Sequence, residues 1–214
     1  MLQLALVRTM DANGDTVFAV FVGAILATAG GFFAGQVENT LRRRERERGA
    51  ALLFGEILST LSVIVRIADE ARSRGDPYGR VTMRTLKAAQ RETHTYDRNR
   101  ETLFDLRDPF VRAGVHSLIV RLSLALEGAL EADDALIALQ HAGLVADASA
   151  GEPDPRLQVY IRDRETAFEY AIELRGEIPP LLARLGRIAR HSFDALEAVS
   201  GDYLGINPPW VDPS

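Results

Sequence analysis

The chain has 214 residues, of which 47% are hydrophobic and 26% are charged, and it contains no cysteine. This length suits one domain plus an additional segment. The absence of cysteine excludes a disulfide framework, a thiolate zinc site and a cysteine nucleophile. The formal charge is −1 over residues 1–35 and +2 over residues 36–74, which leaves −6 for the remainder. Because nucleic-acid binding needs a basic surface, we expect no nucleic-acid partner for this acidic body.

An uncharged block of twenty residues, 16–35, follows a short tail at 1–15. As a helix it would extend about 30 Å, the thickness of a bilayer's hydrocarbon core, which predicts a transmembrane helix over 16–37. Two alternatives fit less well. A buried core helix rarely runs this long with only two threonines as polar residues, and a cleaved signal peptide carries its basic residues before the apolar run. Nine strongly apolar residues favour insertion: Val17, Phe18, Val20, Phe21, Val22, Ile25, Leu26, Phe32 and Phe33.

Small residues recur at every fourth position of this segment and share one helical face. Such a face lets two helix backbones approach closely, so we expect contact with a second copy of the chain or with a partner's membrane helix. The alternative is that the small residues only reflect an Ala/Gly-rich composition. The face consists of Ala19, Gly23, Ala27, Gly31 and Gly35.

A basic cluster follows the apolar segment, whereas Arg8 is the only basic residue before it. The excess of basic residues on one side predicts a cytoplasmic C-terminal body and an external N-terminus, in the inner (plasma) membrane of a bacterium. The cluster would also attract anionic lipid headgroups, although a simple stop-transfer signal explains it equally well. Its members are Arg42, Arg43, Arg44, Arg46 and Arg48.

The juxtamembrane region 38–74 continues as an amphipathic helix whose apolar residues step by three and four from Leu53 to Ala68. Gly75 and Pro77 predict its end, and we interpret Arg74-Gly75-Asp76 as a turn.

Residues 75–200 predict further helices and no strand. The first covers 81–106 with a narrow apolar stripe. A central helix begins at Asp108-Pro109 and continues to about residue 143, with a possible break near Gly128 or Asp133. After a polar loop at 146–154, a helix runs from Asp154-Pro155 to Ile178. Pro179 and Pro180 should interrupt it before a last helix at 181–199.

These elements predict an all-α fold, in which a single N-terminal transmembrane helix continues into an antiparallel cytoplasmic helix bundle. The tail 201–214 should be extended. Its Tyr203, Ile206 and Trp210 would pack on the bundle or dock on another protein.

No pattern of catalytic residues is evident. Phosphate-binding loops, the nucleophile elbow and the zinc-protease helix are absent from the sequence, and so are the paired Glu-x-x-His motifs of a di-iron bundle. Glu165, Glu169 and Glu173 share one helical face, which we interpret as solvated. The densest polar stretch is 91–101, where any site would be sought first. The strongest apolar stripe of the body lies in the central helix and comprises Val111, Val115, Leu118, Ile119, Leu122 and Leu126. His116 adjoins this core stripe and is expected to be a hydrogen-bonded core histidine rather than a ligand.

We therefore expect no catalytic, cofactor-binding or metal-binding residue. The favoured hypothesis is a non-enzymatic, single-pass membrane protein that acts as an interaction scaffold or as an accessory subunit of a membrane complex. Its expected partners are the lipid bilayer, anionic headgroups, and a second copy or a partner membrane helix. Two alternatives are a membrane-linked sensor or transducer, and a helical enzyme or effector with a site near 94–101.

Overall fold

The computed structural model describes residues 2–141 and 155–193, and within these ranges the side chains of 20–27, 31 and 35 onward. The chain forms two compact units, Met1–Arg46 and Glu47–Ser214. The described residues form helices and no strand, which confirms the prediction of an all-helical protein. The helices are α1 (Leu2–Ser73), α2 (Arg80–Arg98), the short 3₁₀ helix η1 (Arg100–Asp105), α3 (Pro109–His141), α4 (Pro155–Arg175) and α5 (Ile178–Ala189).

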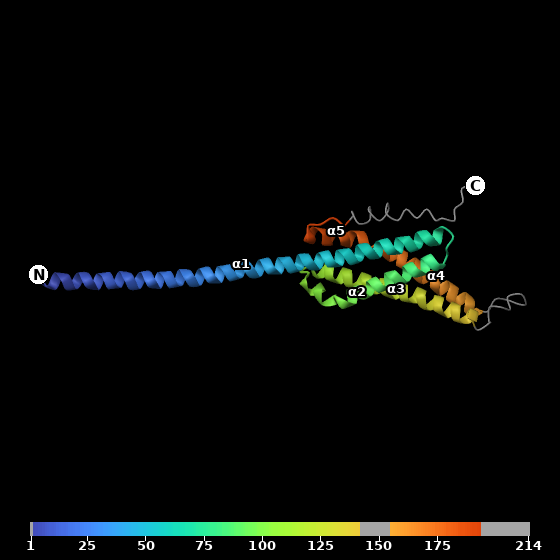
Figure 1. Cartoon of the computed structure of the whole chain (residues 1–214), viewed down its shortest axis with the longest axis horizontal. Coiled ribbons are helices and arrows are strands. Elements are labelled where there is room, and N and C mark those ends of the chain that lie inside the picture. The colour runs from blue at the N-terminus through green and yellow to red at the C-terminus, as the bar shows by residue number, and fades with distance from the viewer. Residues whose placement is uncertain (1, 142–154, 194–214) are drawn as a thin grey trace, which may run out of the picture. The chain divides into compact units, whose positions relative to one another are not determined.

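In the second unit, the C-terminal part of α1 packs with α2, α3, α4 and α5 (Figure 1). Neighbouring helices of the bundle run in opposite directions, as pairs of contacting residues show. Between α3 and the chain that follows it, Asp133 contacts Arg164, whereas the earlier Arg121 contacts the later Glu177. Between α2 and α3, Tyr96 contacts His116 and the earlier Thr93 contacts the later Ser123. Helices α2, α3 and α4 therefore alternate in direction.

The core consists of the apolar stripes that the periodicity predicts. Ile57, Leu61 and Ala68 of α1 are buried, and so are Val115 and Leu122 of α3. Complete burial of each large aliphatic side chain stabilises the fold by about 1.5–3 kcal/mol. The largest fully buried side chains are Tyr96, Phe54 and Phe168, contributed by three different helices.

Several predicted helix boundaries are confirmed. Helix α1 ends at Ser73, and Gly75 adopts a φ of 96° in the turn that follows. Helix α3 begins at Pro109, and one oxygen of the Asp108 carboxylate accepts hydrogen bonds from the amides of Phe110 (2.8 Å) and Val111 (3.4 Å). This carboxylate satisfies amides that the first turn of a helix cannot pair internally.

Four boundary predictions were wrong. The helix expected at 81–106 stops at Arg98, because Asn99 donates its side-chain amide to the Thr95 carbonyl oxygen and competes with the helical pattern. Helix α3 does not break near Gly128 or Asp133. The expected interruption at Pro179-Pro180 occurs earlier, at residues 176–177, and both prolines lie in the first turn of α5, where no amide donor is needed.

The last predicted helix, 181–199, also differs. Helix α5 ends at Ala189, since Arg190 adopts a left-handed conformation with φ 54°. The predicted loop 146–154 lies outside the described residues, and so does the tail 201–214 with Tyr203, Ile206 and Trp210.

Candidate functional site

The predicted membrane segment exposes large apolar side chains within the first unit. Val20, Phe21, Ile25 and Leu26 are 68%, 64%, 53% and 67% exposed. Contiguous apolar surface of this kind marks a contact with lipid or with another protein. The first unit does not bury these four side chains, so another molecule would have to shield them from water.

The small-residue face is equally open. A Cβ atom added at Gly23, Gly31 or Gly35 would meet no heavy atom within 4 Å. Ala27 is exposed, and the side chain of Ala19 lies outside the described set. Four members of the predicted face are thus accessible for close approach by a second helix.

The basic cluster divides between the two units. In the first unit, Arg42 donates to Glu38 one helical turn away at 2.6 Å, and Arg43, Arg44 and Arg46 are exposed. Arg48 belongs to the bundle, where its Nε donates to the carbonyl oxygen of Ala189 at 2.9 Å. Arg48 therefore joins α1 to the end of α5.

The polar stretch 91–101 contributes to a polar seam between α2 and α3, defined by Thr93, Tyr96, His116, Ser123 and Glu127. The Tyr96 hydroxyl lies 2.6 Å from Nδ1 of His116, and Tyr96 is 1% exposed. Burial raises the pKa of the Tyr96 phenol. The expectation of a hydrogen-bonded histidine beside the core is confirmed.

Farther along the polar seam, the Ser123 hydroxyl contacts Thr93 at 3.3 Å and donates to the Glu127 carboxylate at 3.2 Å. Burial also raises the pKa of Glu92, which precedes Thr93 on α2. A nucleophilic serine needs a base that is itself oriented by a third group, and the two contacts of Ser123 do not form that arrangement. The polar seam is suited to fixing the register of α2 against α3.

A buried ion pair between α3 and α4 was missed by the sequence reasoning. Arg164 donates to Asp133 at 2.6 Å, and the two side chains are only 16% and 10% exposed. The Arg164 guanidinium also lies 3.8 Å from the centre of the Tyr78 ring. Asp133 lies three residues from both Leu130 and Leu136, which are buried. That spacing is the signal that places Asp133 on the core side of α3 rather than at a break.

The remaining acidic residues are dispersed. Glu165, Glu169 and Glu173 are exposed on α4, as the solvated-face interpretation requires. Among the side chains that the structure describes, no group of three or more His, Asp or Glu residues is arranged to hold a metal ion.

By length and composition, two helical stretches of the described chain are able to cross a membrane: Gly35–Ser73 of α1 and Pro109–His141, which is α3. Both contribute to the core of the bundle, and core helices of water-soluble proteins satisfy the same criterion. No protein-family model matches the chain, and no curated protein or solved structure is significantly similar to it.

Proposed function

We propose that the protein is a single-pass membrane protein whose helix bundle acts as a non-catalytic scaffold or accessory subunit of a membrane complex. In this proposal residues 16–37 cross the bilayer, with the N-terminus outside. The chain then continues into an antiparallel bundle in the bacterial cytoplasm. The exposed apolar surface at Val20, Phe21, Ile25 and Leu26 is the observation that carries the proposal.

A lipid bilayer would shield this apolar surface from water. Strongly apolar residues at the centre of a helix each favour insertion by about 0.3–0.6 kcal/mol. Helix α1 pairs its backbone amides and carbonyls internally, which the hydrocarbon core requires of any spanning segment. The arginines at 42–46 would then lie at the cytoplasmic headgroups, where each adds about 1 kcal/mol of attraction to anionic lipid.

The open small-residue face supports assembly within the membrane. Lipid tails offer no hydrophobic driving force for helix pairing, so association depends on close backbone packing. Because Gly23, Gly31 and Gly35 leave room for a neighbour, this face suits a second copy of the chain or a partner helix.

Crosslinking in native membranes tests the assembly. Gly31→Leu places a bulky side chain on the small-residue face and should abolish most of the crosslinked dimer or heterocomplex. Ala29→Leu introduces the same leucine about 160° around the helix from position 31, so it is the matched control and should leave the crosslinks unchanged. Intact crosslinks in Gly31→Leu would contradict assembly through this face.

The topology is tested with single cysteines, since the native chain has none. In intact cells, a membrane-impermeant maleimide should label Asn13→Cys but should label Ala138→Cys, at an exposed position of α3, only after the membrane is opened. Labelling of both positions in intact cells would refute a cytoplasmic bundle.

One observation favours the sensor as a second candidate. Helix α1 continues from Leu2 to Ser73 with no break, so a shift at one end can be transmitted along it. Cysteine accessibility along 38–73 should then change under membrane stress. A constant pattern under every stress would remove this candidate and leave the scaffold proposal standing.

A further inference from the structure

We infer that one end of the bundle, which carries Phe104 and Phe110, docks on the anionic surface of the same bilayer that anchors the chain. This inference rests on the membrane anchor of the proposed function. It assigns a role to residues of the bundle, which are not part of the membrane anchor.

The two phenylalanines are unusually exposed. Phe104 of η1 and Phe110 of α3 are 75% and 78% exposed, more than Val20 or Phe21 in the apolar segment itself. They flank Arg107 by three residues on either side, so the connection between η1 and α3 presents two aromatic rings to its surroundings. Aromatic side chains at this exposure fit the boundary between headgroups and acyl chains.

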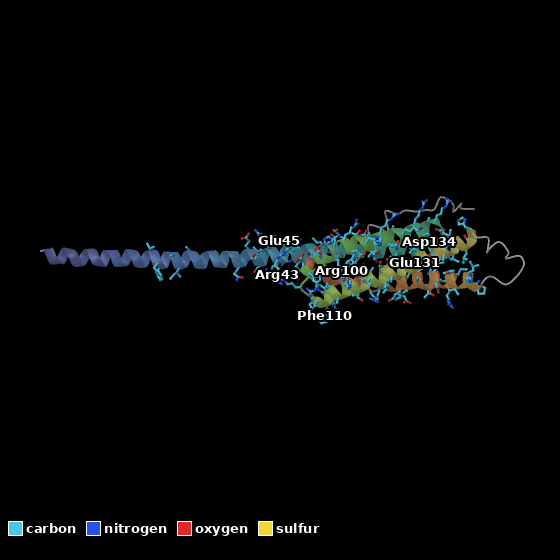
Figure 2. The ribbon with its side chains drawn as sticks, turned by 90° about the horizontal axis from the view of Figure 1, so that it is seen from below. Arg43, Glu45, Arg100, Phe110, Glu131 and Asp134 are labelled. Atoms are coloured by element: carbon cyan, nitrogen blue, oxygen red, sulfur yellow. The ribbon has the colours of Figure 1, made fainter. Side chains whose placement is uncertain are left out.

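Both rings lie at the end of the bundle where α1 enters it, here called the Glu47 end. Arg107 pairs with Glu47 through its side chain at 3.2 Å and through its backbone amide at 3.1 Å. In Figure 2, Phe110 lies at this end of the bundle with Arg100, and Asp134 lies toward the opposite end. The Glu47 end therefore carries both exposed phenylalanine rings, and contacts within the bundle hold this end together.

The same end carries arginines suited to lipid phosphate. Helix α5 and its C-cap contain Arg184, Arg187 and Arg190, all exposed, and α5 has no acidic residue. A hollow of about 380 Å³ is lined by Arg184, Arg187, Ile188, Val111 and Asp108. The Asp108 carboxylate already accepts hydrogen bonds from two backbone amides. Two guanidinium groups and one carboxylate give the lining of the hollow a net positive charge, and guanidinium groups bind phosphate oxygens in a forked geometry.

The length of the connecting chain selects the bilayer as the occupant. Glu47 follows Val37, the last residue of the predicted span, by ten residues. These residues extend about 15 Å as a helix and about 35 Å when fully extended. The connecting chain therefore keeps Glu47 within about 35 Å of the end of the span. The opposite end lies much farther along the bundle, because α3 alone extends about 42 Å between Phe110 and Ala138.

The test uses the full chain in phosphatidylcholine vesicles, with and without phosphatidylglycerol, containing a lipid with a nitroxide in its headgroup. A fluorophore is attached to Ala113→Cys beside Phe110, to Ala138→Cys at the far end, or to Leu26→Cys in the span. We expect lipid quenching at position 113 only in vesicles with phosphatidylglycerol, and none at position 138. The probe at position 26 should adopt the blue-shifted emission of a hydrocarbon environment in both vesicles.

Two paired substitutions identify the contacts. Replacing Arg184 and Arg187 by Gln should lower the ratio of docked to undocked bundle about thirtyfold, since each basic residue contributes roughly a fivefold factor near such a surface. Replacing Phe104 and Phe110 by Ser should also reduce quenching at position 113. Both rings are exposed, so the helical circular dichroism should be unchanged.

The outcomes separate the two proposals. A blue-shifted probe at position 26 without quenching at position 113 would overturn the docking inference and leave the anchor intact. Equal quenching at position 138, or a blue shift at position 113 without lipid quenching, would also overturn it, since the contact would be a flat-lying bundle or another protein. A probe at position 26 that reports water would overturn the anchor and the docking together.

Discussion

Replacing Asp133 by Ala should destabilise the bundle by about 3 kcal/mol, because it removes one partner of a buried ion pair and leaves the other charge in place. Arg164 is only 16% exposed, and its contact with Asp133 is 2.6 Å long. Breaking a buried pair in this way typically costs about 3–5 kcal/mol. We expect the lower end, because the guanidinium retains its position over the Tyr78 ring at 3.8 Å.

A second ion pair, which lies nearer the middle of α3, supplies the control. Arg121 and Glu177 also connect α3 to the α4–α5 region, but their side chains are 36% and 51% exposed. Water screens an exposed pair, so Glu177→Ala should cost less than about 1 kcal/mol. The contrast between the two substitutions isolates the effect of burial.

The measurement is equilibrium urea unfolding of the full chain in detergent, followed by helical circular dichroism. Asp133→Leu combined with Arg164→Met replaces the pair by apolar side chains and should recover most of the lost free energy of unfolding. Two results would refute the reasoning: an Asp133→Ala cost no greater than that of Glu177→Ala, or a double variant as unstable as the sum of its single variants.

Three further predictions concern the interior of the bundle. Gly55→Ala should lower Tm and cost about 1–3 kcal/mol, because the added Cβ would overlap the Phe193 ring; an unchanged Tm would contradict this packing. Glu92→Gln should raise the free energy of unfolding at neutral pH. Burial raises the pKa of Glu92, so its contribution is fully present only below its ordinary pKa and is lost as pH rises through the raised value. Urea titrations across acidic to neutral pH should show the advantage of the variant vanish at low pH, and a constant advantage would refute the linkage. Tyr96→Phe should cost about 1–2 kcal/mol in the same unfolding assay by leaving Nδ1 of His116 without its hydrogen-bond partner, and a cost near zero would show that water replaces the phenol.

The sequence by itself was sufficient for the helical class and for most core stripes, because burial on one side of a helix imposes a repeat of three to four residues. Ile57, Leu61 and Leu122 show this directly, since each lies in a predicted stripe and is buried. The start of α3 was also predictable, because Asp108 and Pro109 act through neighbouring backbone groups alone.

Tertiary contacts decided what local pattern left open. The sequence near Asp133 predicted a possible break in the helix. In the structure Arg164 of α4 pairs with Asp133, and this ion pair offsets the cost of burying a carboxylate in an unbroken helix. The hydrogen-bond partner of His116 is Tyr96, which lies on a different helix and twenty residues earlier in the chain.

The grouping of Phe104 and Phe110 with arginines of α5 also depends on tertiary contacts. Neither residue belongs to a stripe, and sequence spacing alone gives no reason to group them with Arg184 and Arg187 of α5. Folding brings η1, the start of α3 and the end of α5 to the Glu47 end, through the contacts of Arg107 with Glu47 and of Arg48 with Ala189. The periodicity of apolar residues indicates which face of a single helix is buried. Which side chains from different helices share an end is decided only when the helices pack, because those contacts join residues far apart in the chain.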